Sequence, residues 1–173
     1  PMAMSEDCLF LNVHTPKGAT AAAAAGAPAS RPVMIWIHGG SYTTGESNDY
    51  TGDTLVAASQ GTTCALPNSS ASATPTAAAP AAVAADSSVV VVTINYRLNA
   101  FGFLGARHLA AEEGAAGTGN YGIADQRAAM AWVRAHIGAF GGNGSDVTVF
   151  GESAGGNSVW NHLVRPASFG LYT

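Results

Sequence analysis

The stretch Val147–Val159, VTVFGESAGGNSV, changes its character in the middle. Its first four residues are β-branched or aromatic, which favours a β-strand. Its last residues return to helical spacing of apolar side chains. Only Gly-Glu-Ser-Ala-Gly lies between, so Ser153 must occupy a very tight turn from strand to helix.

The residues around Ser153 fit the pattern G-x-S-x-G, in the strand-turn-helix context that gives this pattern its meaning. Such a turn is strained and raises the serine hydroxyl above the end of the strand. Gly151 and Gly155 keep the surrounding space free of side chains, and the helix N-terminus favours developing negative charge. Ser153 is therefore a candidate nucleophile. An ordinary glycine-rich strand-to-helix turn is the structural alternative.

A second glycine-rich loop, HGGSY at residues 38–42, follows the continuous apolar run Val33–Ile37. Acyl transfer needs backbone N–H groups aimed at the oxyanion of the tetrahedral intermediate. A Gly-Gly loop lets the backbone approach a substrate without hindrance. We expect Gly40 and Ser41 to donate two such N–H groups, and Ala154, which follows the candidate nucleophile, to donate a third.

Four apolar runs predict strands and two amphipathic stretches predict helices. The strands are Leu9–Val13, Val33–Ile37, Val89–Asn95 and Asp146–Phe150, and the helices are Ile123–Ile137 and Ala154–Val164. Alternating strands and helices imply an α/β fold with a mostly parallel sheet. Two alanine-rich tracts, at about residues 19–30 and 57–88, are read as low-complexity loop insertions.

The composition predicts one globular domain, with 47% hydrophobic and 10% charged residues in 173. The net charge of −4 argues against nucleic acid as a partner, and no apolar run is long enough to span a membrane. No Cys/His spacing suggests a metal site. Cys8 and Cys64 are expected not to pair with each other. Because the chain begins with Pro1, we expect it to be a piece of a longer protein.

Five stretches resemble the N-terminal part of type-B carboxylesterases, the cholinesterase-like branch of the α/β-hydrolases. They occur in the family's order and cover most of the chain outside the alanine-rich tracts. The stretches are SEDCLFLNV, PVMIWIHGGSYTTG, VVVVTINYRLNAFGFLG, GNYGIADQRAAMAWVRAHIGAFGGNGSDVTVFGESAGG and SVWNHLVRPASFGL.

The resemblance implies that residues 1–173 are part of one carboxylesterase type-B domain. It implies hydrolysis of small-molecule carboxylic esters through an acyl-enzyme on Ser153, without a cofactor. It also implies that the strand ending at Ile37 lies beside the strand ending at Phe150, which brings the two loops together. The residues with supporting roles around the nucleophile would be His38, Gly39, Gly151, Glu152 and Gly155.

The chain departs from the family pattern in several places. Ser41 replaces the third glycine of the oxyanion loop, which is tolerable unless that position needs a positive φ. Asn99 also replaces a glycine, and asparagine tolerates the left-handed region better than most residues. Glu152 is not such a departure; the resemblance implies that it belongs to a buried polar network near the site.

The acid and the histidine of the family's triad lie well after the serine, and we expect both outside these 173 residues. His162 lies nine residues beyond Ser153 on the same predicted helix, about 13 Å along its axis, and cannot reach the hydroxyl. We interpret it as a packing or surface histidine. His38 belongs to the oxyanion loop, where we expect it to shape the loop and not to act as a base. Asp125 is expected to be structural.

Three alternatives remain at this stage. One is a non-catalytic, cholinesterase-like adhesion or recognition module, although such modules typically lose the nucleophile that this chain keeps. Another is an inactive hydrolase remnant. A third is a hydrolase like hormone-sensitive lipase, which shares HGG and GESAGG but not SEDCLFLNV or NYRLNAFGFLG. Expressed alone, the chain would expose Asp146–Phe150 as a sheet edge, so we expect it to be poorly soluble and inactive.

Overall fold

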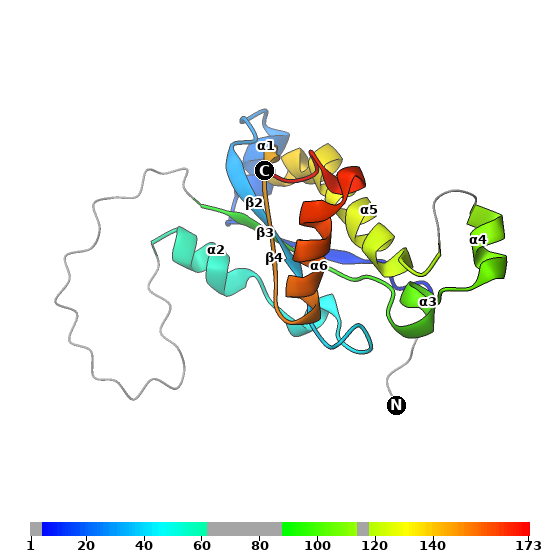
Figure 1. The fold of residues 1–173 in the computed structure, drawn as a ribbon. Coiled ribbons are helices and arrows are strands. Elements are labelled where there is room, and N and C mark those ends of the chain that lie inside the picture. The colour runs from blue at the N-terminus through cyan, green and yellow to red at the C-terminus, as the bar shows by residue number, and fades with distance from the viewer. Residues whose placement is uncertain (1–4, 62–87, 114–117) are drawn as a thin grey trace, which may run out of the picture.

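A computed structural model describes residues 5–61, 88–113 and 118–173 (Figure 1). Its strands are β1 Leu11–His14, β2 Arg31–Ile37, β3 Val90–Ile94 and β4 Gly142–Gly151. Its α-helices are α1 Ala19–Ala24, α2 Asp53–Ser59, α3 Asn99–Phe103, α4 Arg107–Glu113, α5 Tyr121–His136 and α6 Ala154–Val164. The described residues also form the short 3₁₀ helices η1 Ser47–Asp49, η3 Ile137–Phe140 and η4 Pro166–Ser168.

The four strands form one sheet in the order β1-β3-β2-β4. β2 pairs in parallel with both β3 and β4, and β1 pairs antiparallel with β3. The predicted mostly parallel α/β sheet is therefore confirmed. The register pairs Trp36 with Phe150 and Ile37 with Gly151, so the strand that ends at Ile37 lies beside β4 as the resemblance implies.

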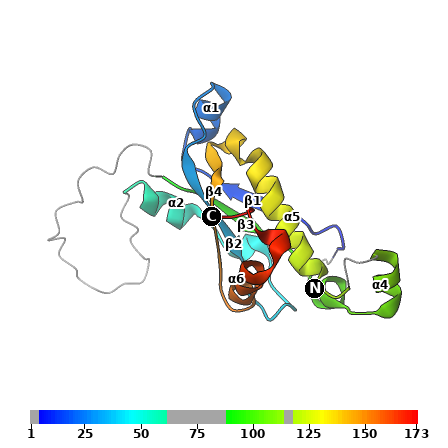
Figure 2. The same ribbon diagram turned by 45° about the horizontal axis from the view of Figure 1, so that its top comes forward.

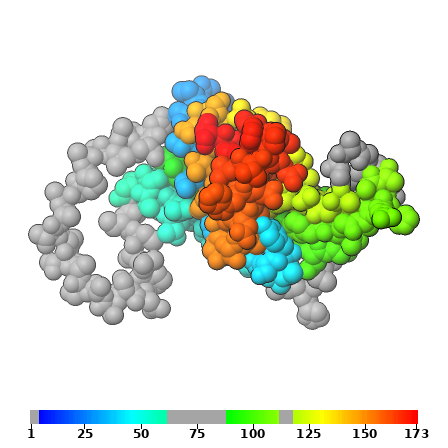
Figure 3. Space-filling model, viewed as in Figure 1, coloured from blue at the N-terminus to red at the C-terminus, as the bar shows by residue number. Residues whose placement is uncertain are grey.

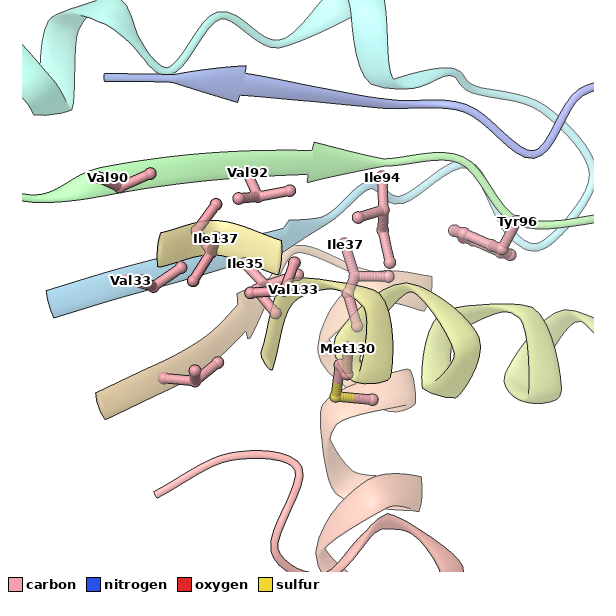
Figure 4. Packing of buried hydrophobic residues seen from close by; sticks show 11 residues of the cluster. Val33, Ile35, Ile37, Val90, Val92, Ile94, Tyr96, Met130, Val133 and Ile137 are labelled. Carbon is pink, nitrogen blue, oxygen red and sulfur yellow. The ribbon is translucent and has the colours of Figure 1, made fainter. Parts of the chain in front are cut away.

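Helices cover both faces of this sheet. α5 and α6 lie on one face and α2 on the other (Figures 1 and 2). Side chains of β2 and β3 that point to the first face form the hydrophobic core with α5 and η3 (Figure 4). The prediction of an amphipathic helix at residues 123–137 is confirmed, because four of its apolar side chains lie on one stripe and are buried: Ile123, Met130, Val133 and Ile137. The helix itself begins two residues earlier than predicted, at Tyr121.

The first alanine-rich tract is not simply a loop, so that prediction is wrong for α1. Alanine has the highest helix propensity, which favours a short helix once tertiary contacts support it. Ala19 provides such support, since it is only 2% exposed and lies near Gly141 at the end of η3. The segment therefore packs on the body of the protein.

The second tract is only partly described. Its first three residues, 57–59, end α2, and residues 62–87, which include Cys64, lie outside the described residues. The N–H of Val89 donates to Ser59 Oγ at 3.0 Å, so the two described ends of the tract meet beside β3. No helix within the described ranges is long and apolar enough to cross a membrane.

Two strand predictions need correction. Leu9 lies outside β1 and is 52% exposed, because pairing with β3 begins only at Leu11, opposite Ile94. β4 is not buried along its length, since it lies at the edge of the sheet and pairs only with β2. Val147 is its one fully buried apolar side chain among the described residues.

Candidate active site

Ser153 occupies the turn between β4 and α6, with φ 54° and ψ −118°. A non-glycine residue rarely adopts this conformation, which costs on the order of 1–3 kcal/mol. The side chain is exposed, while Ala154 and Gly155 directly after it are buried. The predicted strained turn with an accessible serine is what the structure contains.

The glycines on either side of Ser153 allow α6 to approach β2 very closely. A Cβ on Gly151 would lie 2.7 Å from the carbonyl oxygen of Ile37, and a Cβ on Gly155 would overlap the same oxygen. These atoms belong to the backbone and cannot move aside independently. Both glycines are therefore needed to seat the serine turn against the end of β2.

The loop after β2 lies directly against the serine turn. A Cβ on Gly39 would lie 2.6 Å from Glu152 Oε2 and 3.1 Å from Ser153 Cβ. The absence of a side chain at Gly39 thus permits contact between the two loops. The structure brings together the two glycine-rich segments that sequence analysis singled out separately.

The loop at residues 40–42 has an unusual backbone. Gly40, Ser41 and Tyr42 have φ values of 104°, 55° and 61°, so three consecutive residues are left-handed. Ser41 therefore stands at a position that does need a positive φ, which makes its substitution for glycine a strained one. Within the described ranges, no residue accepts a hydrogen bond from the N–H of Gly40, Ser41 or Ala154.

His38 stabilises this loop from the buried side, through a hydrogen bond and ring stacking. It is 1% exposed, its Nδ1–H donates to the carbonyl of Gly39 at 2.8 Å, and its ring stacks on Tyr96 at 4.5 Å. The Tyr96 hydroxyl donates to the His38 carbonyl at 2.8 Å. Burial lowers the pKa of His38, which favours the neutral ring. These contacts fit a role in shaping the loop.

A buried polar network that sequence analysis missed connects α5, α6, η4 and the loop. Gln126 Nε2 donates to Ser158 Oγ at 3.0 Å, and His162 Nε2 donates to Gln126 Oε1 at 2.9 Å. Ser168 Oγ lies 2.9 Å from His162 Nδ1, and Ser158 Oγ lies 3.3 Å from the hydroxyl of Tyr42. The sequence feature that could have revealed this network is a polar residue at a core-facing position of the helix, since Gln126 follows Ile123 by three residues.

His162 is a packing histidine and not a surface one, since it is 1% exposed. Burial, followed by the positive charges of Arg127 and Arg165, lowers its pKa to about 4. Its ring is occupied by Gln126 and Ser168, in agreement with the expectation that it does not serve Ser153.

Asp125 has the expected structural environment. It is 7% exposed and accepts from Arg97 Nε at 2.8 Å, from Nη2 at 2.7 Å and from the backbone N–H at 3.0 Å. Arg97 also lies over the ring of Tyr121. This bidentate pair fixes the segment after β3 to α5.

Asn99, which departs from the family pattern, and Glu152, which the family places in a buried network, have different outcomes. Asn99 has φ 51°, so the left-handed turn survives there as expected. Glu152 is exposed in the described structure, which differs from the buried network that the resemblance implies. It follows the edge strand β4, and among its described neighbours Gly39 approaches its carboxylate.

Comparisons with known proteins agree with this geometry. The model of the carboxylesterase family matches residues 1–173. The cocaine esterase of Oryctolagus cuniculus is 41% identical over 171 residues, which cover 98% of this chain and 24% of that protein. The para-nitrobenzyl esterase of Bacillus subtilis is 39% identical over 170 residues, which cover 97% of this chain and 27% of that protein.

A crystal structure of a carboxylesterase from Geobacillus stearothermophilus superposes with a TM-score of 0.70 at 37% identity, covering 98% of this chain and 28% of that one. Such neighbours confirm that the described sheet and helices are part of an α/β-hydrolase fold. The chain spans about a quarter of the length of the relatives it matches. It belongs to the carboxylesterase family.

Proposed function

We propose that the protein containing this chain hydrolyses carboxylic esters, with Ser153 as the nucleophile. One observation carries the proposal: the strained conformation of Ser153, at φ 54° and ψ −118°, directly beside the Gly39 loop. Such strain persists only where the surroundings impose it, and it clusters at active sites. A glycine-rich turn without a catalytic role has no need of it.

In the proposed mechanism, Ser153 Oγ attacks the ester carbonyl carbon and a general base takes its proton. The carbonyl oxygen becomes an oxyanion that accepts hydrogen bonds from the N–H groups of Gly40, Ser41 and Ala154. Removing one such donor typically costs about 10²–10³ in rate. The alcohol leaves after taking a proton, and water then hydrolyses the acyl-enzyme. No cofactor takes part.

The general base and its acid partner lie, in this proposal, outside the 173 residues. His38 and His162 are bonded to other groups, His38 to the Gly39 carbonyl and His162 to Gln126 and Ser168. The relatives are carboxylesterases about four times as long, which leaves ample chain for a downstream acid and histidine. Those same relatives do not favour the adhesion-module alternative.

Ester turnover by the protein at its natural length tests the proposal. A p-nitrophenyl ester should give a burst of nitrophenol as the acyl-enzyme forms, followed by slower turnover. Ser153→Ala should abolish both phases. Ser145→Ala, at an exposed serine near the start of β4, should leave both unchanged. Turnover that survives in Ser153→Ala would overturn the assignment.

A further inference from the structure

The left-handed loop that presents the proposed oxyanion donors is held from outside by Asn99. The backbone N–H of Asn99 donates to the carbonyl of Tyr42 at 2.8 Å. Its side-chain Nδ2 donates to the carbonyl of Thr43, also at 2.8 Å. One residue, 56 positions later in the chain, thus bonds two successive carbonyls directly after Ser41.

The backbone at residues 41 and 42 needs such support. Ser41 and Tyr42 both carry a Cβ and both have positive φ, which disfavours this conformation relative to extended backbone. Among the described residues, the hydrogen bonds within the loop all go to the carbonyl of Gly40, from the N–H groups of Thr43 and Thr44 at 2.9 and 3.0 Å and from their hydroxyls at 3.1 and 3.4 Å, so none of them holds the carbonyls of Tyr42 and Thr43. External hydrogen bonds to Tyr42 and Thr43 are therefore placed where the loop would otherwise relax.

Asn99 is itself fixed to the body of the fold. Arg97, two residues before it, is bound by the Asp125 carboxylate on α5 through its side chain and its N–H. A Cβ on Gly102 or Gly122 would overlap or crowd the Arg97 carbonyl, so α3 and α5 also pack tightly there. A chain of contacts therefore connects α5 to the loop through Arg97 and Asn99.

The side chain of Asn99 provides a hydrogen bond to Thr43 that its backbone cannot provide. Asn99 has φ 51°, where a glycine would be the least strained residue. A glycine would keep the N–H bond to Tyr42 but would lose the Nδ2 bond to Thr43. We infer that Asn99 is a positioning residue whose amide side chain holds the loop 40–44, and with it the N–H groups of Gly40 and Ser41, in the conformation seen. Its effect on catalysis rests on the proposed function.

Three variants of the protein at its natural length test this inference. Asn99→Asp keeps the shape and tolerates the left-handed region, but an oxygen replaces the donor. Asn99→Gly removes the side chain and relieves the strain. Ala100→Asp adds the same charge as the first variant at the next, exposed residue, and serves as the control.

Two readouts are measured for each variant. Amide hydrogen exchange at Thr43 and Thr44 reports opening of the loop, whether or not the protein is an enzyme. The rate at which a fluorophosphonate labels Ser153 reports the catalytic consequence. Because the Asn99 bond is exposed, we expect a change of about tenfold: faster exchange and slower labelling in both Asn99 variants. Ala100→Asp should match the wild type.

Asn99→Gly with wild-type exchange and wild-type labelling would overturn the inference, because the asparagine would then only tolerate its conformation. The failure of the proposed function is distinguishable. In that case wild-type protein resists labelling altogether, while the exchange of the loop still responds to both Asn99 variants.

Discussion

A single methyl group added at Gly155 should test most directly how closely α6 packs against the end of β2. A Cβ there would overlap the carbonyl oxygen of Ile37 and would lie 2.8 Å from its carbon and 3.0 Å from the carbonyl oxygen of His38. Ordinary Cβ contacts lie at 3.4–4 Å. In Gly155→Ala, α6 must therefore move away from the Ile37 carbon by about 0.6 Å at least, and farther from the oxygen.

This displacement has two expected consequences. Overpacking of this kind costs about 1–3 kcal/mol of unfolding free energy. Ser153 and Ala154 move with the end of α6, and a shift of about 1 Å in a site costs on the order of 10²-fold in rate. We expect fluorophosphonate labelling of Ser153 to slow about tenfold to hundredfold.

Gly156→Ala is the matched control on the same helix. The nearest atom to its Cβ would be the carbonyl oxygen of Gly151, at 3.4 Å, which is an ordinary contact. Both variants gain up to about 1 kcal/mol of helix propensity, so the difference between them isolates the clash. Denaturant unfolding and labelling rates are measured on both. Equal stability and equal labelling in the two variants would refute the close packing of α6 on β2.

The remaining predictions concern stability and solubility. Asp125→Asn should lower the unfolding free energy by about 3 kcal/mol, because it leaves a charged Arg97 without its buried partner. Asp53→Asn, at a carboxylate that is 80% exposed and contacts His14 Nδ1, should cost under about 1 kcal/mol, and equal losses in the two variants would contradict this prediction. The neutral His162 contributes stability that is fully present above its ordinary pKa of 6.5 and is lost as pH falls toward about 4. The loss of unfolding free energy should approach about 3 kcal/mol at most. Urea titrations at several pH values should show a weaker pH dependence of stability in His162→Gln, whereas His136→Gln, at an exposed histidine, should keep the pH dependence of the wild type. The 173 residues expressed alone should aggregate, because β4 is an open sheet edge and α6 lies at the surface (Figure 3) with its apolar Trp160 and Val164 71% and 76% exposed. A stable monomer in size-exclusion chromatography would contradict this.

The elements that sequence analysis predicted well are those whose signal is local. The apolar runs of β2 and β3 and the stripe of α5 follow from periodicity, and α6 begins and ends at the predicted residues. The turn at Ser153 was predictable because G-x-S-x-G has a fixed structural context. Its contact with the Gly39 loop followed from the resemblance, which fixes the order of β2 and β4.

The predictions that failed depended on tertiary contacts. Leu9 alternates like a strand residue, but whether it pairs is decided by the length of β3 opposite it. The alanine-rich segment forms α1 because η3 offers a surface to pack on, which composition alone does not reveal. The Gln126–His162 network joins residues 36 positions apart, and only the geometry of two packed helices brings them together.

The central claim is that Ser153 is an activated nucleophile. Its most direct test is to treat the protein at its natural length with a fluorophosphonate and to map the adduct by peptide mass spectrometry. We predict one adduct, on the peptide that carries Ser153, and none in Ser153→Ala. An unmodified Ser153 in folded protein, or an adduct only on another serine, would contradict the account.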